Sequence, residues 1–187
     1  MVARDRNIKI VMLGPAACGK SVLVNLLADQ ADLARVPYRP TSALRILHCD
    51  VPGTVSETSL PRRLAVQLWD VGGKKENQHF WNACLYGADG LILVYDSDRS
   101  GQVKELQSLL YYFTQRPQSA ILKSLPLSNV LSVVRYKTNS PSQLTTSLLP
   151  PEFAGKITEV HHSYEDDAAI LKNHFTKFVN DISEIKL

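Results

Sequence analysis

The chain has 187 residues, enough for one domain with a buried core, and its 44% hydrophobic and 21% charged residues are ordinary for a globular protein. Its formal net charge of +3 is too small, and its Lys and Arg residues too scattered, to indicate a nucleic-acid-binding protein. Three cysteines without metal-ligand spacing argue against a secreted disulfide scaffold and favour a reducing compartment.

The two ends of the sequence carry no signal that we can connect with secretion or lipid attachment. The first seven residues, MVARDRN, lack the apolar core of a signal peptide, and position 2 is not the Gly that N-myristoylation requires. The last four residues, EIKL, offer no cysteine for prenylation, and no apolar run has the length of a transmembrane helix. We therefore expect a soluble cytoplasmic protein without a direct lipid anchor.

Short apolar runs alternate with amphipathic stretches, a pattern typical of a mostly parallel sheet with helices on both faces. Strands are expected at residues 8–13, 43–51, 64–70, 90–95, 130–134 and 157–160. Helices are expected at residues 21–28 and 77–86, along the apolar face of Val103, Leu106, Leu110 and Phe113, and along the last apolar face of Leu171, Phe175, Phe178, Ile182 and Ile185. The expected fold is α/β, a single domain over residues 1–187 with six strands and about five helices.

The most specific motif follows the first expected strand. Residues 14–21, GPAACGKS, match the phosphate-binding pattern G-x-x-x-x-G-K-S/T in full. Its glycines let backbone N–H groups converge on phosphate oxygens, and the following helix directs its positive end to the same point. Lys20 is expected to contact the β- and γ-phosphates, and the Ser21 hydroxyl to ligate Mg²⁺. The nucleotide-binding residues expected in this loop are Gly14, Ala16, Ala17, Cys18, Gly19, Lys20 and Ser21.

Three residues inside this loop differ from a glycine-rich pattern. Ala16 and Ala17 stand where glycine is often found, so their methyl groups are expected to crowd the γ-phosphate region. Cys18 is expected to be a small filler, with a redox role as the alternative.

Two further loops indicate a nucleotide-dependent switch. Residues 70–73, DVGG, match D-x-x-G, so that Asp70 is expected to hold Mg²⁺ through water and the Gly73 N–H to contact a γ-phosphate. Residues 38–41, YRPT, place Thr41 where it could ligate Mg²⁺ only when a γ-phosphate is bound. Such a pair of loops orders with a triphosphate and relaxes without it.

The order and spacing of these motifs resemble the Ras superfamily of small GTPases over nearly the whole chain. A closer similarity is to the Rab-like 5 family, the Rab-like GTPase subunit of intraflagellar transport complex B. It rests on the GPxxxGKS loop, ALRILHCD at residues 43–50, QLWD at 67–70 followed by Gly72 and Gly73, the pair Phe80 and Trp81, and SYEDD at 163–167.

This resemblance implies a P-loop NTPase fold of the small-GTPase G-domain type, with GTP or GDP and Mg²⁺ as cofactors. It also implies a scaffold role that docks on coiled-coil subunits of the transport complex, with no nucleic acid and no lipid anchor involved. The implied location is the cytoplasm and the cilium or flagellum with its base.

The residues that should read the base depart from the superfamily pattern Asn-Lys-x-Asp. Residues 136–139 read YKTN, so Lys137 keeps its place and can stack its stem over the base, whereas Tyr136 and Asn139 replace the Asn and the Asp. The Asn139 oxygen can accept a hydrogen bond from guanine, but its NH₂ group would face another donor. We expect weaker or less selective guanine binding.

The last base-contacting motif of the superfamily, Ser-Ala-Lys, would fall on Ser163, Tyr164 and Glu165. Ser163 and Tyr164 are therefore expected beside the nucleotide. An equally good interpretation is that Ser163 caps a helix beginning near Glu165, because Ser is favoured at helix N-caps.

Lys74 follows Gly73, where hydrolysing members of the superfamily usually carry a Gln that orients the attacking water. A lysine has three donors and no acceptor, so it cannot hold that water in the same way. We expect intrinsic hydrolysis to be very slow, and no catalytic residue is assigned.

The expected function is a Rab-like GTP-binding protein with poor intrinsic hydrolysis, acting as an interaction module of intraflagellar transport. The alternative is a cycling GTPase of Arf- or Rab-like type in vesicle trafficking, which Lys74 and the missing lipid-anchor signal disfavour. A nucleotide kinase is less favoured still, because residues 138–151 contain no Arg for a lid. Phe80 and Trp81 are expected in the core, with a partner interface as the alternative.

Overall fold

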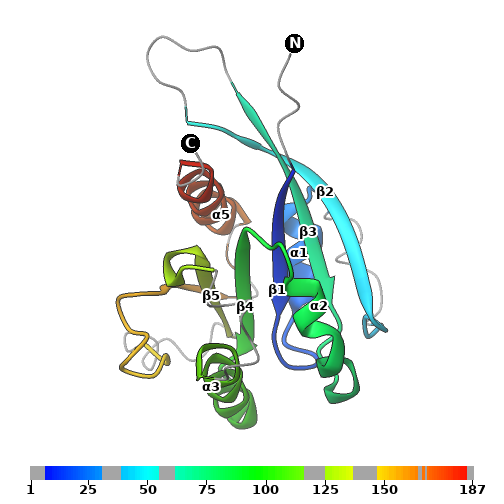
Figure 1. Cartoon of the computed structure of the whole chain (residues 1–187), viewed down its shortest axis with the longest axis vertical. Helices are drawn as coiled ribbons and strands as arrows, with labels where there is room; N and C mark the ends of the chain where they lie inside the picture. Colours follow the sequence, from blue (N-terminus) through cyan, green and yellow to red (C-terminus); the bar gives the residue numbers. More distant parts are fainter. Residues whose placement is uncertain are drawn as a thin grey trace.

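Six strands form one sheet in the computed structural model, which describes residues 7–30, 39–54, 62–115, 125–136, 147–163, 166 and 168–184. The strands are β1 (Ile8–Leu13), β2 (Leu44–Pro52), β3 (Arg63–Val71), β4 (Gly90–Asp96), β5 (Val130–Tyr136) and β6 (Thr158–Ser163). Their order across the sheet is β2-β3-β1-β4-β5-β6, with β2 antiparallel to β3 and every other neighbouring pair parallel (Figure 1). All six expected strands are confirmed.

The parallel strands all end at the same edge of the sheet. The residues at these carboxyl ends are Leu13, Val71, Asp96, Tyr136 and Ser163. Ligands of open α/β sheets bind beyond this edge, because the loops that leave the strands meet there. The motif loops at residues 14–21 and 70–73 both follow strands that end at this edge.

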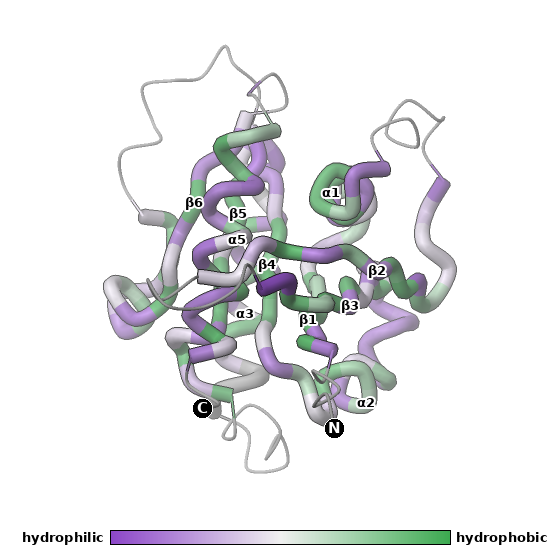
Figure 2. The backbone as a smooth tube through the Cα atoms, turned by 90° about the horizontal axis from the view of Figure 1, so that it is seen from above, coloured by the Kyte–Doolittle hydropathy of each residue, from purple (hydrophilic) through white to green (hydrophobic). Residues whose placement is uncertain are grey.

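Helices cover both faces of the sheet. They are α1 (Lys20–Leu27), α2 (Trp81–Leu85), α3 (Ser100–Gln115) and α5 (Ala168–Glu184), with short 3₁₀ turns η2 (Lys75–Phe80) and η3 (Leu127–Asn129). Figure 2 shows α1 and α2 on opposite sides of β1 and β3. Leu23 and Phe175 are buried in the core cluster of one face, and Trp81 and Leu106 in that of the other. The described residues thus contain four α-helices and two 3₁₀ turns, close to the expected five helices.

The segment expected as one helix over residues 77–86 is divided instead into η2 and α2. The Asn77 side chain is 9% exposed and donates from Nδ2 to the carbonyl oxygen of Ser42 at 2.9 Å. Its backbone N–H bonds the Lys74 carbonyl oxygen three residues earlier, at 2.9 Å, which is the tighter 3₁₀ pattern. Contacts with another part of the chain therefore override the helical propensity of this segment.

The far end of the β2–β3 hairpin is fastened to α5, beside which it lies in Figure 1. Asn180 accepts the Thr54 N–H through Oδ1 at 2.6 Å and donates from Nδ2 to the Pro52 carbonyl oxygen at 2.9 Å. The same Nδ2 also donates to the Thr176 carbonyl oxygen within α5 at 2.8 Å. Asn180 is 4% exposed, so its side chain makes these contacts from within the packed face of α5.

The substitution Asn180→Ala is expected to lower the free energy of unfolding by about 1–3 kcal/mol, because it removes three hydrogen bonds, each of which contributes about 0.5–1.5 kcal/mol. Urea denaturation followed by circular dichroism measures the loss. The matched control is Asn173→Ala, at an exposed position of the same helix, where we expect a change within about 0.5 kcal/mol. Equal losses for the two variants would contradict the anchoring role.

Candidate nucleotide-binding site

The loop between β1 and α1 folds around the side chain of Lys20. Lys20 is 6% exposed, and its Nζ donates to the carbonyl oxygens of Gly14 at 2.9 Å and Pro15 at 2.7 Å. Gly19 precedes α1 with φ 91°, a left-handed conformation that favours glycine. The ammonium group is thereby held at the N-terminus of α1, where free backbone N–H groups and the helix dipole favour an anion.

The middle of this loop is supported from α3 and from the core. Ala17 has φ 58°, which is uncommon for a residue with a Cβ. Gln102 donates from Nε2 to the Ala16 carbonyl oxygen at 3.1 Å, a support that the sequence alone did not reveal. Cys18 is 0% exposed, and burial raises the pKa of its thiol. A buried, protonated thiol fits the filler role better than the redox alternative.

A cavity of about 450 Å³ lies against this loop. Its lining comes from the phosphate loop, α1, both expected switch segments and the residue that precedes α3. The lining residues are Ala16, Ala17, Gly19, Lys20, Ser21, Val22, Pro40, Thr41, Gly73, Lys74 and Arg99. Ala16 and Ala17 both line this cavity. The expectation that their methyl groups crowd a γ-phosphate stays a prediction.

Three oxygen-bearing side chains expected to hold Mg²⁺ meet beside the cavity. The Ser21 and Thr41 hydroxyl oxygens lie 2.8 Å apart, and Thr41 Oγ1 donates to Asp70 Oδ2 at 3.3 Å. Asp70 is 0% exposed, and its Oδ1 is buried without a hydrogen-bond partner. A buried carboxylate oxygen needs a partner, and Mg²⁺ prefers oxygen ligands with one or two carboxylates. This group of residues therefore fits a bound Mg²⁺.

Gly73 lies in close contact with the phosphate loop. A Cβ at this position would stand 2.5 Å from the Gly14 carbonyl oxygen and 2.6 Å from Lys20 Nζ, so no larger residue fits. Lys74 follows, exposed, and lines the cavity. The D-x-x-G loop thus contacts the phosphate loop through Gly73. Lys74 stands at the position where hydrolysing members of the superfamily usually carry a Gln.

Two arginines near the cavity were not expected from the sequence. Arg45 on β2 contacts Asp70 Oδ2 through Nη2 at 3.1 Å. Arg99 lines the cavity and forms an ion pair with Asp96, Nε to Oδ2 at 3.3 Å. The contact of Arg45 with Asp70 could have been predicted from the sequence, because antiparallel pairing of the two expected strands 43–51 and 64–70 can bring these residues opposite one another.

Only part of the expected base-reading region lies among the described residues. Lys137, Asn139 and Tyr164 fall outside them. Tyr136 ends β5 and pairs in register with Ser163, which ends β6 and is 1% exposed. Both therefore lie at the same sheet edge as the phosphate loop.

The N-cap interpretation of Ser163 stays a prediction, because the neighbours that would decide it lie outside the described residues. Ser163 is the last residue of β6, and the described part of α5 runs from Ala168 to Glu184. The Ser163 backbone N–H donates to Asp166 Oδ2 at 2.5 Å, a contact that a capping box also makes. The expectation that Ser163 lies beside the nucleotide also stays a prediction.

The adjacent histidines of β6 play different structural roles. His162 is 3% exposed, and its Nδ1 lies 2.9 Å from Nη1 of Arg135 on the neighbouring strand. A guanidinium can only donate, so Nδ1 of His162 accepts. His161 is half-buried. Neither histidine lines the cavity.

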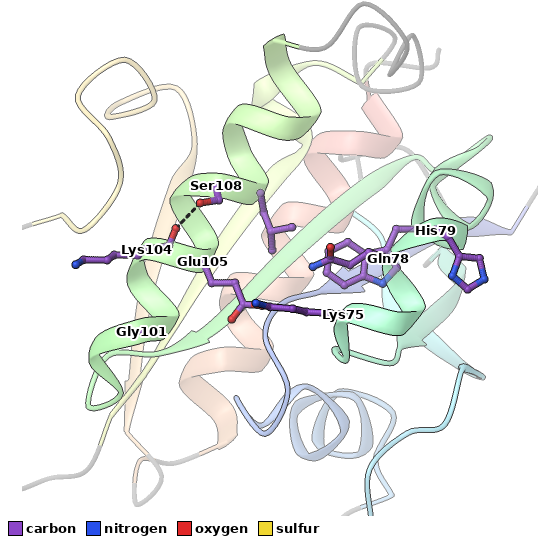
Figure 3. Close-up of a pocket in the computed structure, with 9 residues that line it drawn as sticks. Lys75, Gln78, His79, Gly101, Lys104, Glu105 and Ser108 are labelled. Atoms are coloured by element: carbon purple, nitrogen blue, oxygen red, sulfur yellow. Dashed lines mark hydrogen bonds between the residues drawn. The ribbon is translucent and has the colours of Figure 1, made fainter.

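A second cavity, of about 590 Å³, lies between η2 and α3 (Figure 3). Figure 3 shows Lys75 and Glu105 reaching toward one another from these two elements. Trp81 contributes to its wall but is 1% exposed and belongs to the core, as expected. Phe80 packs half-buried against the same core.

Two further features are absent from the described part of the chain. It contains no group of three or more His, Cys, Asp or Glu side chains arranged to hold a metal ion. None of its helices combines the length and apolar character needed to span a lipid bilayer. A metal at the site described above would therefore depend on hydroxyl ligands, on Asp70 and on the bound ligand itself.

Comparisons with known proteins point to one family. The model of the ADP-ribosylation factor family matches residues 1–149. The intraflagellar transport protein 22 homolog of Homo sapiens is 30% identical over 175 residues, covering 93% of this chain and 89% of that protein. Intraflagellar transport protein 22 of Trypanosoma brucei brucei is 38% identical over 115 residues, covering 58% of this chain and 51% of that protein.

A solved structure gives the same assignment. A chain of the GTP-bound IFT22/74/81 crystal structure from T. brucei has a TM-score of 0.69 and 27% sequence identity to this chain, covering 97% of this chain and 98% of that one. The TM-score over nearly the full length of both chains shows that they share a fold. The chain therefore belongs to the ADP-ribosylation factor family, within the Ras superfamily of small GTPases, and to the group of intraflagellar transport protein 22 homologues.

Proposed function

We propose that this protein is a guanine-nucleotide-binding subunit of intraflagellar transport that binds GTP or GDP together with Mg²⁺ and acts mainly as an interaction module. One observation carries the proposal: the oxygens of Ser21, Thr41 and Asp70 meet beside Lys20 at one cavity, although they come from separate segments of the chain. This arrangement supplies the oxygen ligands and the positive charge that a nucleotide bound with Mg²⁺ requires.

In the proposed site, the phosphates lie against the loop of residues 14–21. Backbone N–H groups at the start of α1 and the Lys20 ammonium supply positive charge to them. Ser21 and Thr41 would hold Mg²⁺ directly and Asp70 through water. The chemistry that Mg²⁺ would supply there is neutralisation of negative charge on the phosphates.

The guanine preference is supported by relatives rather than by base-reading residues of this chain. The T. brucei structure that resembles this chain is described as GTP-bound. Lys137, Asn139, Ser163 and Tyr164 remain the residues proposed to contact the base, with selectivity reduced by Tyr136 and Asn139.

The proposed partners are coiled-coil subunits of intraflagellar transport complex B. The support is the name of the relatives and the T. brucei assembly, which contains IFT22 with components 74 and 81. We place the protein in the cytoplasm and in the cilium or flagellum and its base.

A competition titration of the purified, nucleotide-free protein with GTP, GDP and ATP in the presence of Mg²⁺ tests the nucleotide assignment. A preference for GTP over ATP of about tenfold or more, about 1.4 kcal/mol, is the expected result. Equal binding of ATP, or no nucleotide binding, would overturn it and leave a scaffold that retains the fold alone.

Lys74→Gln is expected to raise the intrinsic rate of GTP hydrolysis by about tenfold or more, because the Gln side chain can accept a hydrogen bond from the attacking water. The wild-type protein should turn over very slowly in the same single-turnover assay with radiolabelled GTP. Lys75→Gln, which removes the neighbouring exposed charge, serves as the matched control and should not change the rate. Rapid hydrolysis by the wild-type protein would refute the proposed role of Lys74.

A further inference from the structure

Arg45 places a fixed positive charge on the metal-ligand carboxylate. It lies on β2 directly opposite Asp70 on β3 in the antiparallel register. Its Nη2 is 3.1 Å from Asp70 Oδ2 and 3.3 Å from the backbone carbonyl oxygen of Ser21. One guanidinium therefore joins the residue proposed to hold Mg²⁺ through water to the helix that carries a direct ligand.

This contact divides the two oxygens of Asp70. Oδ2 accepts hydrogen bonds from both Arg45 and Thr41, whereas Oδ1 has no partner. The carboxylate is completely buried, while the Arg45 side chain is 36% exposed. Arg45 thus fixes the orientation of Asp70 and leaves a single oxygen for the metal.

The charges around the site make this contact important. Ser21 and Thr41 are neutral ligands, so Asp70 supplies the only negative charge among the three proposed metal ligands. The ionisable residues that line the cavity are Lys20, Lys74 and Arg99, all of them cationic. With Arg45 balancing Asp70, the protein contributes no net negative charge to hold a divalent cation, although Mg²⁺ sites normally use one or two carboxylates.

We propose that Arg45 is a positioning residue that weakens the retention of Mg²⁺ by sharing Asp70 with it, so that this protein releases its nucleotide at a higher free Mg²⁺ concentration than it would without the Arg45–Asp70 contact. The inference rests on the proposed nucleotide function.

The test measures the release rate of a fluorescent GDP analogue from the full-length protein against free Mg²⁺ set by EDTA. Arg45→Gln removes the charge, and the Mg²⁺ concentration at the midpoint should fall by about tenfold or more, because one less cation repels the ion. Arg45→Lys keeps the charge and should remain within about threefold of the wild type, because the repulsion is retained. A midpoint for Arg45→Gln that is unchanged or higher, or equal shifts in both variants, overturns the inference.

Arg63→Gln is the matched control for the loss of one positive charge. Arg63 is exposed on β3, seven residues before Asp70, which places it roughly 23 Å along the strand. Its midpoint should equal that of the wild type. If the wild-type protein binds nucleotide and Arg45→Gln leaves the midpoint unchanged, only this inference fails; if the wild-type protein binds no nucleotide at any Mg²⁺ concentration, the proposed function fails as well.

A second readout needs no nucleotide. The melting temperatures of nucleotide-free Arg45→Gln, Asp70→Asn and the double variant give a double-mutant cycle. The double variant should lose less than the sum of the two single losses, because each single change leaves the other partner uncompensated. Additive losses would show that the two groups do not interact, which also overturns the inference.

Discussion

Replacing Lys20 with Met is expected to weaken the binding of GTP and GDP by about 100-fold or more. In the proposed complex its ammonium group makes charge-assisted hydrogen bonds to phosphate oxygens, each worth about 1.5–3 kcal/mol, so the loss of two corresponds to about two to four orders of magnitude. Met keeps the length of the side chain, so the packing around this buried position should change little. Equilibrium titration with a fluorescent guanine nucleotide measures the change.

Two controls separate this effect from misfolding or from a general loss of positive charge. Nucleotide-free Lys20→Met should keep a cooperative thermal unfolding transition, although its melting temperature should fall because the carbonyl oxygens of Gly14 and Pro15 lose the Nζ donor. Lys177→Met, at an exposed position on α5, removes the same charge away from the site and should leave affinity unchanged. Wild-type affinity in Lys20→Met would show that the phosphate loop does not bind the nucleotide in the proposed way.

Trp81→Ala is expected to lower the free energy of unfolding by about 3–5 kcal/mol, the range for removing a large aromatic side chain from a core. Trp81 is 1% exposed and packs in the same cluster as Leu106 and Leu109. Its indole Nε1 also donates to the Gly72 carbonyl oxygen at 3.3 Å, so the side chain supports the D-x-x-G loop from below the surface. Chemical denaturation monitored by circular dichroism measures the loss.

Two companion variants divide this loss into its causes. Trp81→Phe keeps an aromatic ring but removes the donor to Gly72, and should cost about 1–3 kcal/mol. Tyr86→Ala changes an aromatic residue that is 77% exposed, and a change within about 0.5 kcal/mol is expected. If Trp81→Ala were no more destabilising than Tyr86→Ala, the assignment of Trp81 to the core would be untenable.

Strand positions were readily predicted because the buried strands of a parallel sheet are near-continuous apolar runs, and β1 and β4 each contain only one charged residue. The phosphate loop was equally accessible, since its chemistry requires fixed residue types at fixed spacing. By contrast, η2 was predicted as helix because local propensity cannot reveal that Asn77 bonds Ser42, which lies 35 residues away in the sequence. Interactions between distant segments decide such cases.

The residues around the proposed Mg²⁺ site could also be predicted only in part. Ser21, Thr41 and Asp70 could be named from their motifs, and the structure brings them together. Arg45 carries no motif, and its importance emerges only when antiparallel pairing places it opposite Asp70. The sequence around Ser163 is likewise compatible with a strand end and with a helix N-cap. Only the structure shows that β6 ends at this residue.

The fastening of the hairpin to α5 bears on how this protein should be truncated or labelled. β2 runs from the neighbourhood of Thr41 at one end to the Asn180 anchor at the other, so the last helix is part of the frame that holds the metal-ligand segment. A shortened chain that stops before Asn180 would release Thr54 and Pro52 and loosen an edge strand along its length. Fluorophores are better attached at the exposed position of Tyr86, so that the carboxyl-terminal helix stays intact.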